Sequence, residues 1–407
     1  IINEDPLTGI TEIAEPVGVI CGIIPTTNPT STVIFKSLIA LKTRNPIIFS
    51  FHPSAYECSV QAAKVIRDAA IAAGAPDNCI QWLGMRSMYA TNALMNHSGV
   101  ATILATGGNA MVKAAYSCGK PALGVGAGNV PAYVEKSCVL KRAVNDIVLS
   151  KSFDNGMICA SEQAAIVDQE IYDAFKVEMS RFKVYFANHE EKAKLETYMF
   201  GCTAYSDKVN EARLNPAIVG KPATWIAEQA GFKVPEGTNI LAAECAGFVV
   251  PDDTQIICAE CEEVGPNEPL TREKLSPVLA ILKATSTEDG IAKSAAMVAF
   301  NGLGHSAAIH TQNHEISIEF GLKCKAIRVI ENAPSTFGGI GSVYNAFIPS
   351  LTLGCGSYGH NSVSNNVSAI NLLNIKRIGR RNNNMQWMKL PPKIYFERNS
   401  IRYLRDM

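Results

Sequence analysis

The sequence lacks an excess of charge of either sign, a long apolar run and a compact set of cysteines. Its 407 residues carry 37 Lys+Arg and 37 Asp+Glu, so the zero net charge argues against nucleic acid or an anionic membrane as the main partner. No apolar run approaches the roughly 20 residues of a membrane span. The 12 cysteines are scattered and follow no expected signal peptide, unlike those of a small secreted domain. We therefore expect a cytoplasmic protein.

Two further absences limit the possible sites. The pair Cys258 and Cys261 has a metal-type spacing, but no second cysteine pair or His-x-x-x-His follows it, so no metal site is expected. No internal repeat is expected either.

Short apolar runs alternate with amphipathic stretches in the first third of the chain. This alternation predicts an α/β fold with a mostly parallel sheet, which binds ligands at the carboxyl ends of its strands. Expected strands are Val17–Ile24, Ile47–Phe51, Cys79–Leu83, Val100–Leu104, Ala122–Val125 and Val130–Val134. Expected helices are Thr32–Leu41, Ala55–Ala73 (capped by Ser54), Met88–Asn96 and Ala110–Cys118.

A second α/β block follows, and it ends in a basic tail. Strands are expected at Ala165–Val167 and Pro277–Lys283, with a helix over Gln169–Phe182. The proline pair before Lys393–Phe396 predicts an extended segment that serves as a linker or an oligomer arm.

The segment Phe153-Asp-Asn-Gly-Met-Ile-Cys159 places one cysteine among small and polar residues. A thiolate is the attacking form of cysteine, so a nucleophilic thiol needs such partly exposed, polar surroundings. The alternative is an inert cysteine in the core, which is the commoner fate of a cysteine.

Two glycine-rich segments are candidates for a cofactor loop. Thr106-Gly-Gly108 lies between an expected strand and an expected helix, where backbone N–H groups and the helix dipole favour a phosphate or dinucleotide. An ordinary tight turn is the alternative. Gly124-Val-Gly-Ala-Gly-Asn129 does not fit G-x-G-x-x-G, so we interpret it as close backbone packing near a site.

Taken together, these segments resemble the aldehyde dehydrogenase superfamily, and within it the CoA-acylating branch found in bifunctional aldehyde-alcohol dehydrogenases. The resemblance runs from about Glu15 to about Phe396. The matching segments, in order, are Ile24–Thr32, Ala105–Gly108, Gly124–Pro131, Phe153–Glu162, Arg272–Pro277 and Leu353–Ser357. Relatives begin earlier and continue into an iron-dependent alcohol dehydrogenase domain, so the chain is expected to be a portion of such a protein.

The resemblance implies an aldehyde dehydrogenase-like fold. Its expected parts are a Rossmann-type NAD domain, an α/β catalytic domain and a small oligomerisation element, assembled into a homodimer or a filament. The implied boundaries are 1–17 for an oligomerisation and linking segment, 18–127 for the NAD-binding domain without its N-terminal part, 128–345 for the catalytic domain, and 346–407 for a C-terminal return and linker.

The resemblance also assigns roles to individual residues. Cys159 matches the nucleophile, and Asn28 matches the amide that stabilises the oxyanion together with the cysteine N–H. Without the resemblance, Asn28 would be interpreted as a turn residue before Pro29. Glu273 matches the acid that binds the nicotinamide ribose. The full set of implied cofactor residues is Pro25, Thr26, His52, Pro53, Thr106, Gly107, Gly108, Val125, Gly126, Glu273 and Leu275.

Two departures from hydrolytic aldehyde dehydrogenases specify the implied function further. The water-activating glutamate of those relatives is replaced by Gly124, so the thioester on Cys159 is expected to persist for CoA. A lysine that binds the adenosine ribose in many members is replaced by His52, which favours NAD over NADP. The expected reaction converts acetaldehyde, CoA and NAD to acetyl-CoA and NADH. The alternatives are a hydrolytic NAD-dependent aldehyde dehydrogenase and a filament-assembly unit. His305 and His310 are interpreted as structural histidines.

Overall fold

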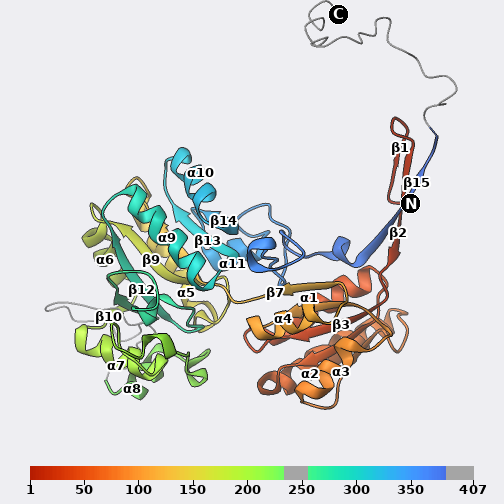
Figure 1. Cartoon of the computed structure of the whole chain (residues 1–407), viewed down its shortest axis with the longest axis horizontal. Helices are drawn as coiled ribbons and strands as arrows, with labels where there is room; N and C mark the ends of the chain where they lie inside the picture. The colour runs from red at the N-terminus through yellow and green to blue at the C-terminus, as the bar shows by residue number, and fades with distance from the viewer. Residues whose placement is uncertain (233–254, 382–407) are drawn as a thin grey trace, which may run out of the picture. The chain divides into compact units, whose positions relative to one another are not determined.

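A computed structural model of the chain describes residues 1–232 and 255–381. The chain divides into two compact units (Figure 1). One unit contains Ile1–Pro16 together with the residues from Leu373 onward, and the other is Val17–Leu372.

The first sheet of the larger unit is parallel and has five strands in the order β5-β4-β3-β6-β7. Helices α1 to α4 connect consecutive strands as crossovers, because parallel neighbours cannot be joined by a hairpin. The strands are β3 (Val19–Ile24), β4 (Ile47–Phe51), β5 (Ile80–Trp82), β6 (Val100–Thr106) and β7 (Ala122–Val125). The helices are α1 (Pro29–Lys42), α2 (Tyr56–Ala72), α3 (Met88–Asn96) and α4 (Asn109–Ser117).

Most of these elements agree with the sequence expectation to within two residues at each end, and the largest difference is the start of α1. Helix α1 begins at Pro29 because proline is well suited to the first helical position, whose N–H has no partner within the helix. The expected cap of α2 is wrong. Ser54 lies in a 3₁₀ turn over Pro53–Ala55, and the Nδ1 atom of His52 accepts from the Ser54 N–H at 3.3 Å.

The second sheet of the larger unit has seven parallel strands in the order β10-β11-β12-β9-β8-β13-β14. Its faces are covered by separate apolar clusters, so its central strands are buried on both sides. The strands are β8 (Val130–Val134), β9 (Glu162–Asp168), β10 (Val184–Phe186), β11 (Ile256–Glu260), β12 (Val278–Ala284), β13 (Gly304–His310) and β14 (Ala326–Glu331). The helices are α5 (Leu140–Ser152), α6 (Tyr172–Ser180), α7 (His189–Phe200), α8 (Ala223–Gln229), α9 (Thr287–Asn301), α10 (His314–Lys323) and α11 (Ser335–Ile340). The expected mixed α/β fold with parallel sheets is confirmed.

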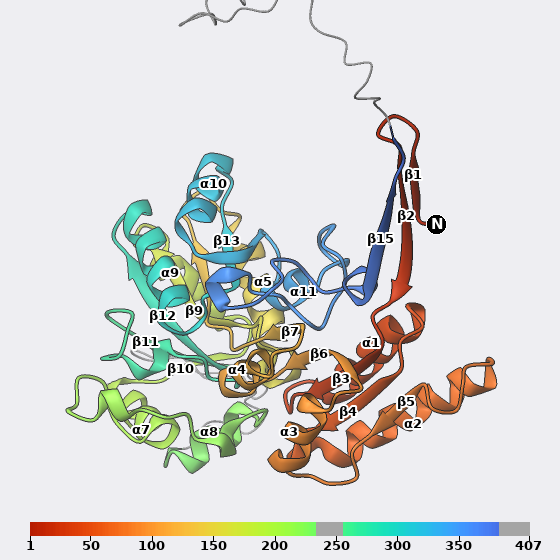
Figure 2. The ribbon, with the colours of Figure 1, turned by 45° about the vertical axis from the view of Figure 1, so that its right-hand side comes forward.

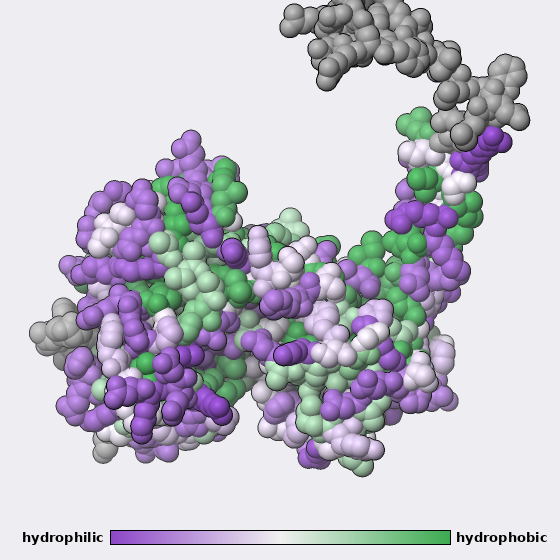
Figure 3. Space-filling model, viewed as in Figure 1, coloured by the Kyte–Doolittle hydropathy of each residue, from purple (hydrophilic) through white to green (hydrophobic). Residues whose placement is uncertain are grey.

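The smaller unit is an antiparallel sheet of three strands, β1 (Asn3–Asp5), β2 (Ile10–Pro16) and β15 (Leu373–Gly379), in the order β1-β2-β15 (Figure 2). Strand β15 pairs with β2 over seven residues each, from Leu373 opposite Pro16 to Gly379 opposite Ile10. Apolar and charged side chains alternate on this sheet (Figure 3), and Leu7 at the β1–β2 turn is 92% exposed. The expected extended segment near Phe396 lies outside the described residues.

The expectation that the sequence contains no internal repeat is wrong. Residues 230–245 (AGFKVPEGTNILAAEC) match residues 246–261 (AGFVVPDDTQIICAEC) at an offset of 16 positions. The second copy supplies the whole of β11 and the following Cys261. Most of the first copy lies outside the described residues.

The described residues contain no helix that is both long and apolar enough to span a membrane. Within the same ranges, no group of three or more His, Cys, Asp or Glu side chains is placed to hold a metal ion. The side chains of Cys258 and Cys261 belong to the apolar clusters on opposite faces of the seven-stranded sheet, so they do not form a ligand pair.

Candidate active site

Cys159 lies in a loop between α5 and β9 whose backbone is unusually constrained. Three successive residues before it have left-handed backbone angles: Asp154 (φ 51°), Asn155 (φ 50°) and Gly156 (φ 65°). Such angles are costly for non-glycine residues and persist only where the surroundings enforce them. The Asn155 amide donates to the Gly220 carbonyl at 3.0 Å, which holds the loop in this conformation. Cys159 itself is half-buried, as a nucleophile that receives substrate must be.

The Cys159 thiol is not a thiolate in this structure. Burial, with smaller contributions from the nearby Glu273 carboxylate and Cys355, raises the pKa of Cys159 to about 12. The Arg328 guanidinium acts in the opposite direction. The expected polar and accessible surroundings are therefore only partly present, because apolar neighbours such as Ile158 and Ala160 pack on either side of the cysteine.

Glu273 lies next to this loop and is tied to the second glycine segment. Its Oε1 atom accepts a hydrogen bond of 3.0 Å from the Gly128 N–H. Burial raises the pKa of Glu273 to about 7, whereas the Gly128 N–H and the lysines Lys151 and Lys274 counteract this increase. Glu273 and Cys159, which are distant in sequence, are thus brought together by the fold.

Gly128 also shows that His305 belongs to the site. A Cβ atom on Gly128 would overlap the Cys159 carbonyl oxygen and would lie 2.9 Å from the Nδ1 atom of His305. His305 is fully buried, and neither of its ring nitrogens has a hydrogen-bond partner. Burial lowers the pKa of His305 to about 3, with a smaller contribution from Arg328, so the imidazole is neutral. The sequence interpretation of His305 as a satisfied structural histidine is wrong, because its nitrogens are unsatisfied.

Arg328 is a member of the site that the sequence analysis missed. This 3% exposed side chain donates to the carbonyls of Gly354 (2.7 Å), His305 (2.8 Å) and Leu353 (3.2 Å), and to Ser306 Oγ (3.2 Å). It therefore connects β13 and β14 with the Leu353–Cys355 segment. The sequence feature that could have identified Arg328 is its place as a single arginine among the apolar residues of Ala326–Glu331, since arginine is rarely buried without a partner.

Gly124 does not face the cysteine. A Cβ atom at this position would lie 2.8 Å from Tyr116 Cε2 and 2.8 Å from Val112 Cγ1, both on α4. The Gly124 N–H also donates to the Tyr116 hydroxyl at 2.9 Å. A side chain at position 124 is thus excluded by α4, and the interpretation of this segment as close backbone packing is confirmed.

The expected cofactor residues of the five-stranded sheet gather at one edge. Pro25 and Thr26 follow β3, His52 and Pro53 follow β4, Thr106 ends β6, Gly107 and Gly108 follow it, and Val125 and Gly126 end and follow β7. All four strands are parallel, so these residues lie at their common carboxyl edge. Gly108 is the N-cap of α4, and a Cβ atom there would meet no atom within 4 Å, so a ligand has room to approach the backbone. The remaining two residues, Glu273 and Leu275, come from the segment before β12, where Leu275 has a left-handed φ of 46°.

Asn28 occupies the N-cap position of α1, but its side chain makes no capping hydrogen bond. In the described ranges, no hydrogen bond connects Asn28 with Cys159 either. The buried Lys36 on the same helix donates to the carbonyls of Ile23 (2.7 Å) and Leu104 (2.8 Å), and so fixes α1 against β3 and β6. The start of α1 is therefore rigidly placed, with its amide side chain uncommitted to the helix.

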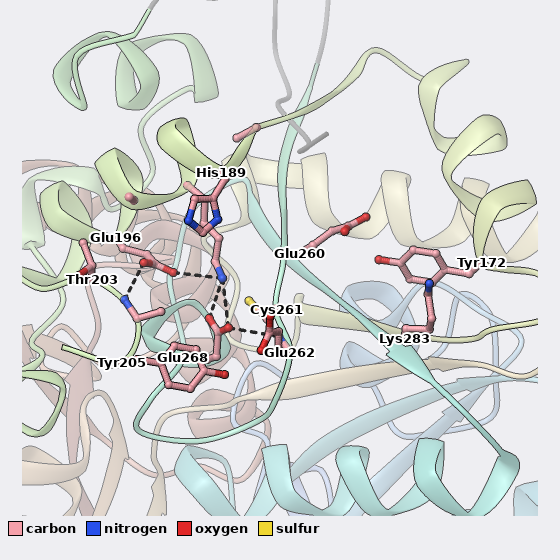
Figure 4. Close-up of a pocket in the computed structure, with 14 residues that line it drawn as sticks. Tyr172, His189, Glu196, Thr203, Tyr205, Glu260, Cys261, Glu262, Glu268 and Lys283 are labelled. Carbon is pink, nitrogen blue, oxygen red and sulfur yellow. Dashed lines mark hydrogen bonds and ion pairs between the residues drawn. The ribbon is translucent and has the colours of Figure 1, made fainter. Parts of the chain in front are cut away.

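Two pockets of the described residues can be compared with the expected site. One of about 640 Å³ is lined by α4, by Gly126 and Ala127, and by Cys355 and Tyr358; Gly126 is the one expected cofactor residue in it. A larger pocket of about 960 Å³ lies beside α7 and contains the ion pair between Lys192 and Glu268 (Figure 4). None of the expected catalytic or cofactor residues lines this larger pocket.

The chain is similar to known proteins over most or all of its length. The model of the aldehyde dehydrogenase family matches residues 2–190. An aldehyde-alcohol dehydrogenase of Streptococcus pneumoniae serotype 4 is 70% identical over 405 residues; the match covers 100% of this chain but 44% of that protein, so the chain spans less than half its length.

Solved structures extend the comparison. The crystal structure of an acetylating aldehyde dehydrogenase from Geobacillus thermoglucosidasius superposes with a TM-score of 0.85 at 43% identity, covering 96% of this chain and 80% of that one. A Rhodopseudomonas palustris propionaldehyde dehydrogenase, solved with bound CoA and an acylated cysteine, has a TM-score of 0.77 at 26% identity over 91% of this chain and 77% of that one.

Proposed function

The chain belongs to the aldehyde dehydrogenase family, and on this premise we propose that it converts acetaldehyde or another short aldehyde, with CoA and NAD, to the acyl-CoA and NADH. The observation that carries the proposal is the pairing of a half-buried Cys159 with Gly124, a residue that has no side chain to act as a base. This arrangement supplies a nucleophile but no carboxylate at the position where hydrolytic relatives activate water.

The chemistry follows from the residues around Cys159. Its sulfur adds to the aldehyde carbonyl, and loss of hydride leaves a thioester on the same sulfur. We assign stabilisation of the transient oxyanion to the Asn28 amide and the Cys159 N–H. The Cys159 thiol loses its proton to solvent before it attacks the aldehyde. The CoA thiol then displaces Cys159 from the acyl group, and the departing sulfur takes up the proton that CoA gives up, which restores the thiol.

We infer that His305 accepts the proton of the incoming CoA thiol. Its imidazole is neutral, and both nitrogens are without partners, so one of them can take a proton. Its proximity to Gly128 places it near the Cys159 backbone. Because burial lowers its pKa to about 3, the proton would be held only transiently.

The cofactor assignment to NAD rests on two features. A nicotinamide cofactor supplies the hydride acceptor, and we assign its ribose to Glu273 and its phosphates to the Gly107–Gly108 turn, where the N-terminus of α4 offers N–H groups. Partial burial lowers the pKa of His52, which therefore has little positive charge with which to hold a 2′-phosphate.

We also propose a cytoplasmic, oligomeric protein. Every cysteine in the described ranges is free, which supports a reducing compartment. Strands β1 and β15 each leave one edge of the three-stranded sheet unpaired within the described part of the chain, and an unpaired edge is suited to contact with a second subunit.

The proposal is tested by NADH formation from acetaldehyde with and without CoA, using the full-length protein. The expected result is about one equivalent of NADH per site without CoA, followed by a slow phase that CoA accelerates strongly. An equal steady-state rate with and without CoA would establish the hydrolytic alternative instead.

A further inference from the structure

A fully buried lysine next to Glu273 has no role in the chemistry described above. The side chain of Lys274 is 0% exposed, yet it carries an ammonium group. Its Nζ atom donates to three backbone carbonyls, those of Leu270 (2.6 Å), Gln163 (2.9 Å) and Arg272 (2.9 Å). Transfer of a charged group from water to the protein interior is unfavourable unless hydrogen bonds or an opposite charge compensate for the lost hydration.

The carbonyls bound by Lys274 come from the two segments that form the candidate site. Gln163 lies in β9, four residues after Cys159, and its side-chain Oε1 also accepts from the Lys274 N–H at 3.0 Å. Leu270 and Arg272 belong to the segment that carries Glu273. Lys274 thus joins β9 to the Glu273 segment through two hydrogen bonds to Gln163, and its bonds to Leu270 and Arg272 hold its own segment around the Nζ atom.

These bonds complete a closed ring around the site. Four residues after Cys159, Gln163 is hydrogen-bonded to Lys274. Next to Lys274 in the chain, Glu273 accepts a hydrogen bond of 3.0 Å from the Gly128 N–H. Gly128 in turn lies against the Cys159 carbonyl, which closes the ring. A second contact closes the same two segments, because Gly156 lies against the Ser276 carbonyl. The carboxylate of Glu273 is therefore held at a fixed place relative to Cys159.

We propose that Lys274 is a positioning residue for the reaction. It holds Glu273 at a fixed position relative to Cys159, and Glu273 in turn positions the ribose of the cofactor. The inference rests on the proposed function, since it assigns Glu273 to the cofactor. Lys274 contacts neither substrate nor cofactor in this role and acts only through Glu273.

The hydrogen-bond pattern requires the charged form of Lys274. Burial lowers the pKa of Lys274, but three carbonyl acceptors call for three N–H donors, which only the ammonium form offers. The charge also acts on Glu273. The titratable groups that face the Glu273 carboxylate are Lys151 from α5, Lys274 from its own segment, and Cys159. Loss of the Lys274 charge removes one of the two cations that lower the pKa of Glu273, so the pKa of this carboxyl should rise further.

The test is Lys274→Met in the full-length protein, measured by NAD binding in a Cys159→Ala background and by the pH profile of kcat/KM for NAD in the active enzyme. We expect the affinity for NAD to fall at least tenfold. The KM for NAD should rise, whereas the rate of thioester transfer to CoA should change less. The acidic limb of the pH profile should move to higher pH. Gln163→Leu, which leaves the ammonium in place, should weaken NAD binding less and leave the acidic limb unmoved.

Lys192→Met is the matched control. The Lys192 side chain is 13% exposed and its Nζ atom pairs with Glu268 at 2.9 Å, and none of the bonds of the ring involves it. The Lys192→Met change should lower the melting temperature without changing NAD binding or the pH profile.

Two outcomes would overturn the inference. One is a Lys274→Met protein with a lower melting temperature but unchanged NAD binding and pH profile. The other is a Lys274→Met protein that does not fold, together with a Gln163→Leu protein that binds NAD normally. Failure of the unaltered protein to bind NAD would reject the assignment of Glu273 itself and the inference with it. NAD binding with no CoA-dependent NADH formation would reject only the proposed reaction.

Discussion

A Cβ atom on Gly128 would overlap the carbonyl oxygen of Cys159, so these two backbones touch where no side chain can intervene. The same glycine donates its N–H to Glu273 at 3.0 Å. Gly128→Ala should therefore displace the cysteine loop and the Glu273 contact together. We expect a loss of about 1–3 kcal/mol in the free energy of unfolding, as is typical of overpacking, and at least a tenfold fall in kcat. Denaturant unfolding and steady-state kinetics would measure the two effects.

Gly321→Ala is the control for this change, because Gly321 lies in α10 and a Cβ atom there meets only Val329 Cγ2 at 4.0 Å. It should stabilise the helix by about 0.5–1 kcal/mol and leave kcat unaltered. Normal activity in Gly128→Ala would show that the contact with Cys159 is not needed.

Cys159→Ala should abolish aldehyde oxidation, because it removes the sulfur on which the thioester forms and the neighbouring Cys355 is only 2% exposed. Binding of NAD should persist, which calorimetry would detect. Cys58→Ala, which alters an exposed cysteine, should retain full activity. An active Cys159→Ala protein would remove the nucleophile assignment.

Gly124→Glu should not create a hydrolytic enzyme. The new side chain would begin 2.8 Å from atoms of Tyr116 and Val112 and would face α4 instead of Cys159. We expect a destabilised protein whose NADH formation without CoA stays at the level of the unaltered protein, per folded molecule. Hydrolysis that rises several-fold would contradict the direction in which position 124 faces.

Glu273→Gln should make stability less sensitive to pH. Burial raises the pKa of Glu273 from about 4.5 to about 7, so the folded state holds a proton that the unfolded state loses. The stability of the unaltered protein therefore falls as pH rises from about 4.5 to 7, by up to about 3 kcal/mol from this group, and the loss remains above pH 7. The variant should melt at a higher temperature than the unaltered protein at pH 8, with no such gain near pH 4.5. Glu319→Gln, on the exposed side of α10, should show no such difference.

Deletion of residues 233–248 should leave the catalytic fold intact. The deletion joins Phe232 to Val249 and leaves one copy of the repeated segment, with every residue of β11 retained. We expect the same activity and an equal or slightly higher melting temperature, because shortening the connection between α8 and β11 by 16 residues changes its closure entropy by only about 0.8 kcal/mol. Removal of 246–261 should also be tolerated, since Ile240–Glu244 preserves the pattern of β11. Removal of 256–271 should prevent folding, because it also eliminates residues 262–271, which lead to Glu273 and have no second copy in the repeat.

The sequence by itself determined the local elements and the residue types of the site. Strands such as Ile47–Phe51 and Ala122–Val125 were predicted with their observed bounds, because an apolar run between turn signals has few other conformations available. The motif around Cys159 and the Gly107–Gly108 turn were predicted from neighbouring residues, whereas the missing carboxylate at Gly124 was implied only by the family resemblance. Helix starts were less certain, and the cap of α2 was wrong because a 3₁₀ turn precedes the helix.

Only the tertiary structure decided which distant side chains meet and in what environment. Arg328, His305 and Lys274 lie far from Cys159 in sequence, and the order of parallel strands brings them to it. The pKa of about 12 for Cys159 and the unsatisfied nitrogens of His305 depend on burial, which a sequence pattern does not specify for a single residue. The physical reason is that a motif fixes the backbone over a few residues, whereas desolvation and charge act between residues that only the packing of sheets and helices places side by side.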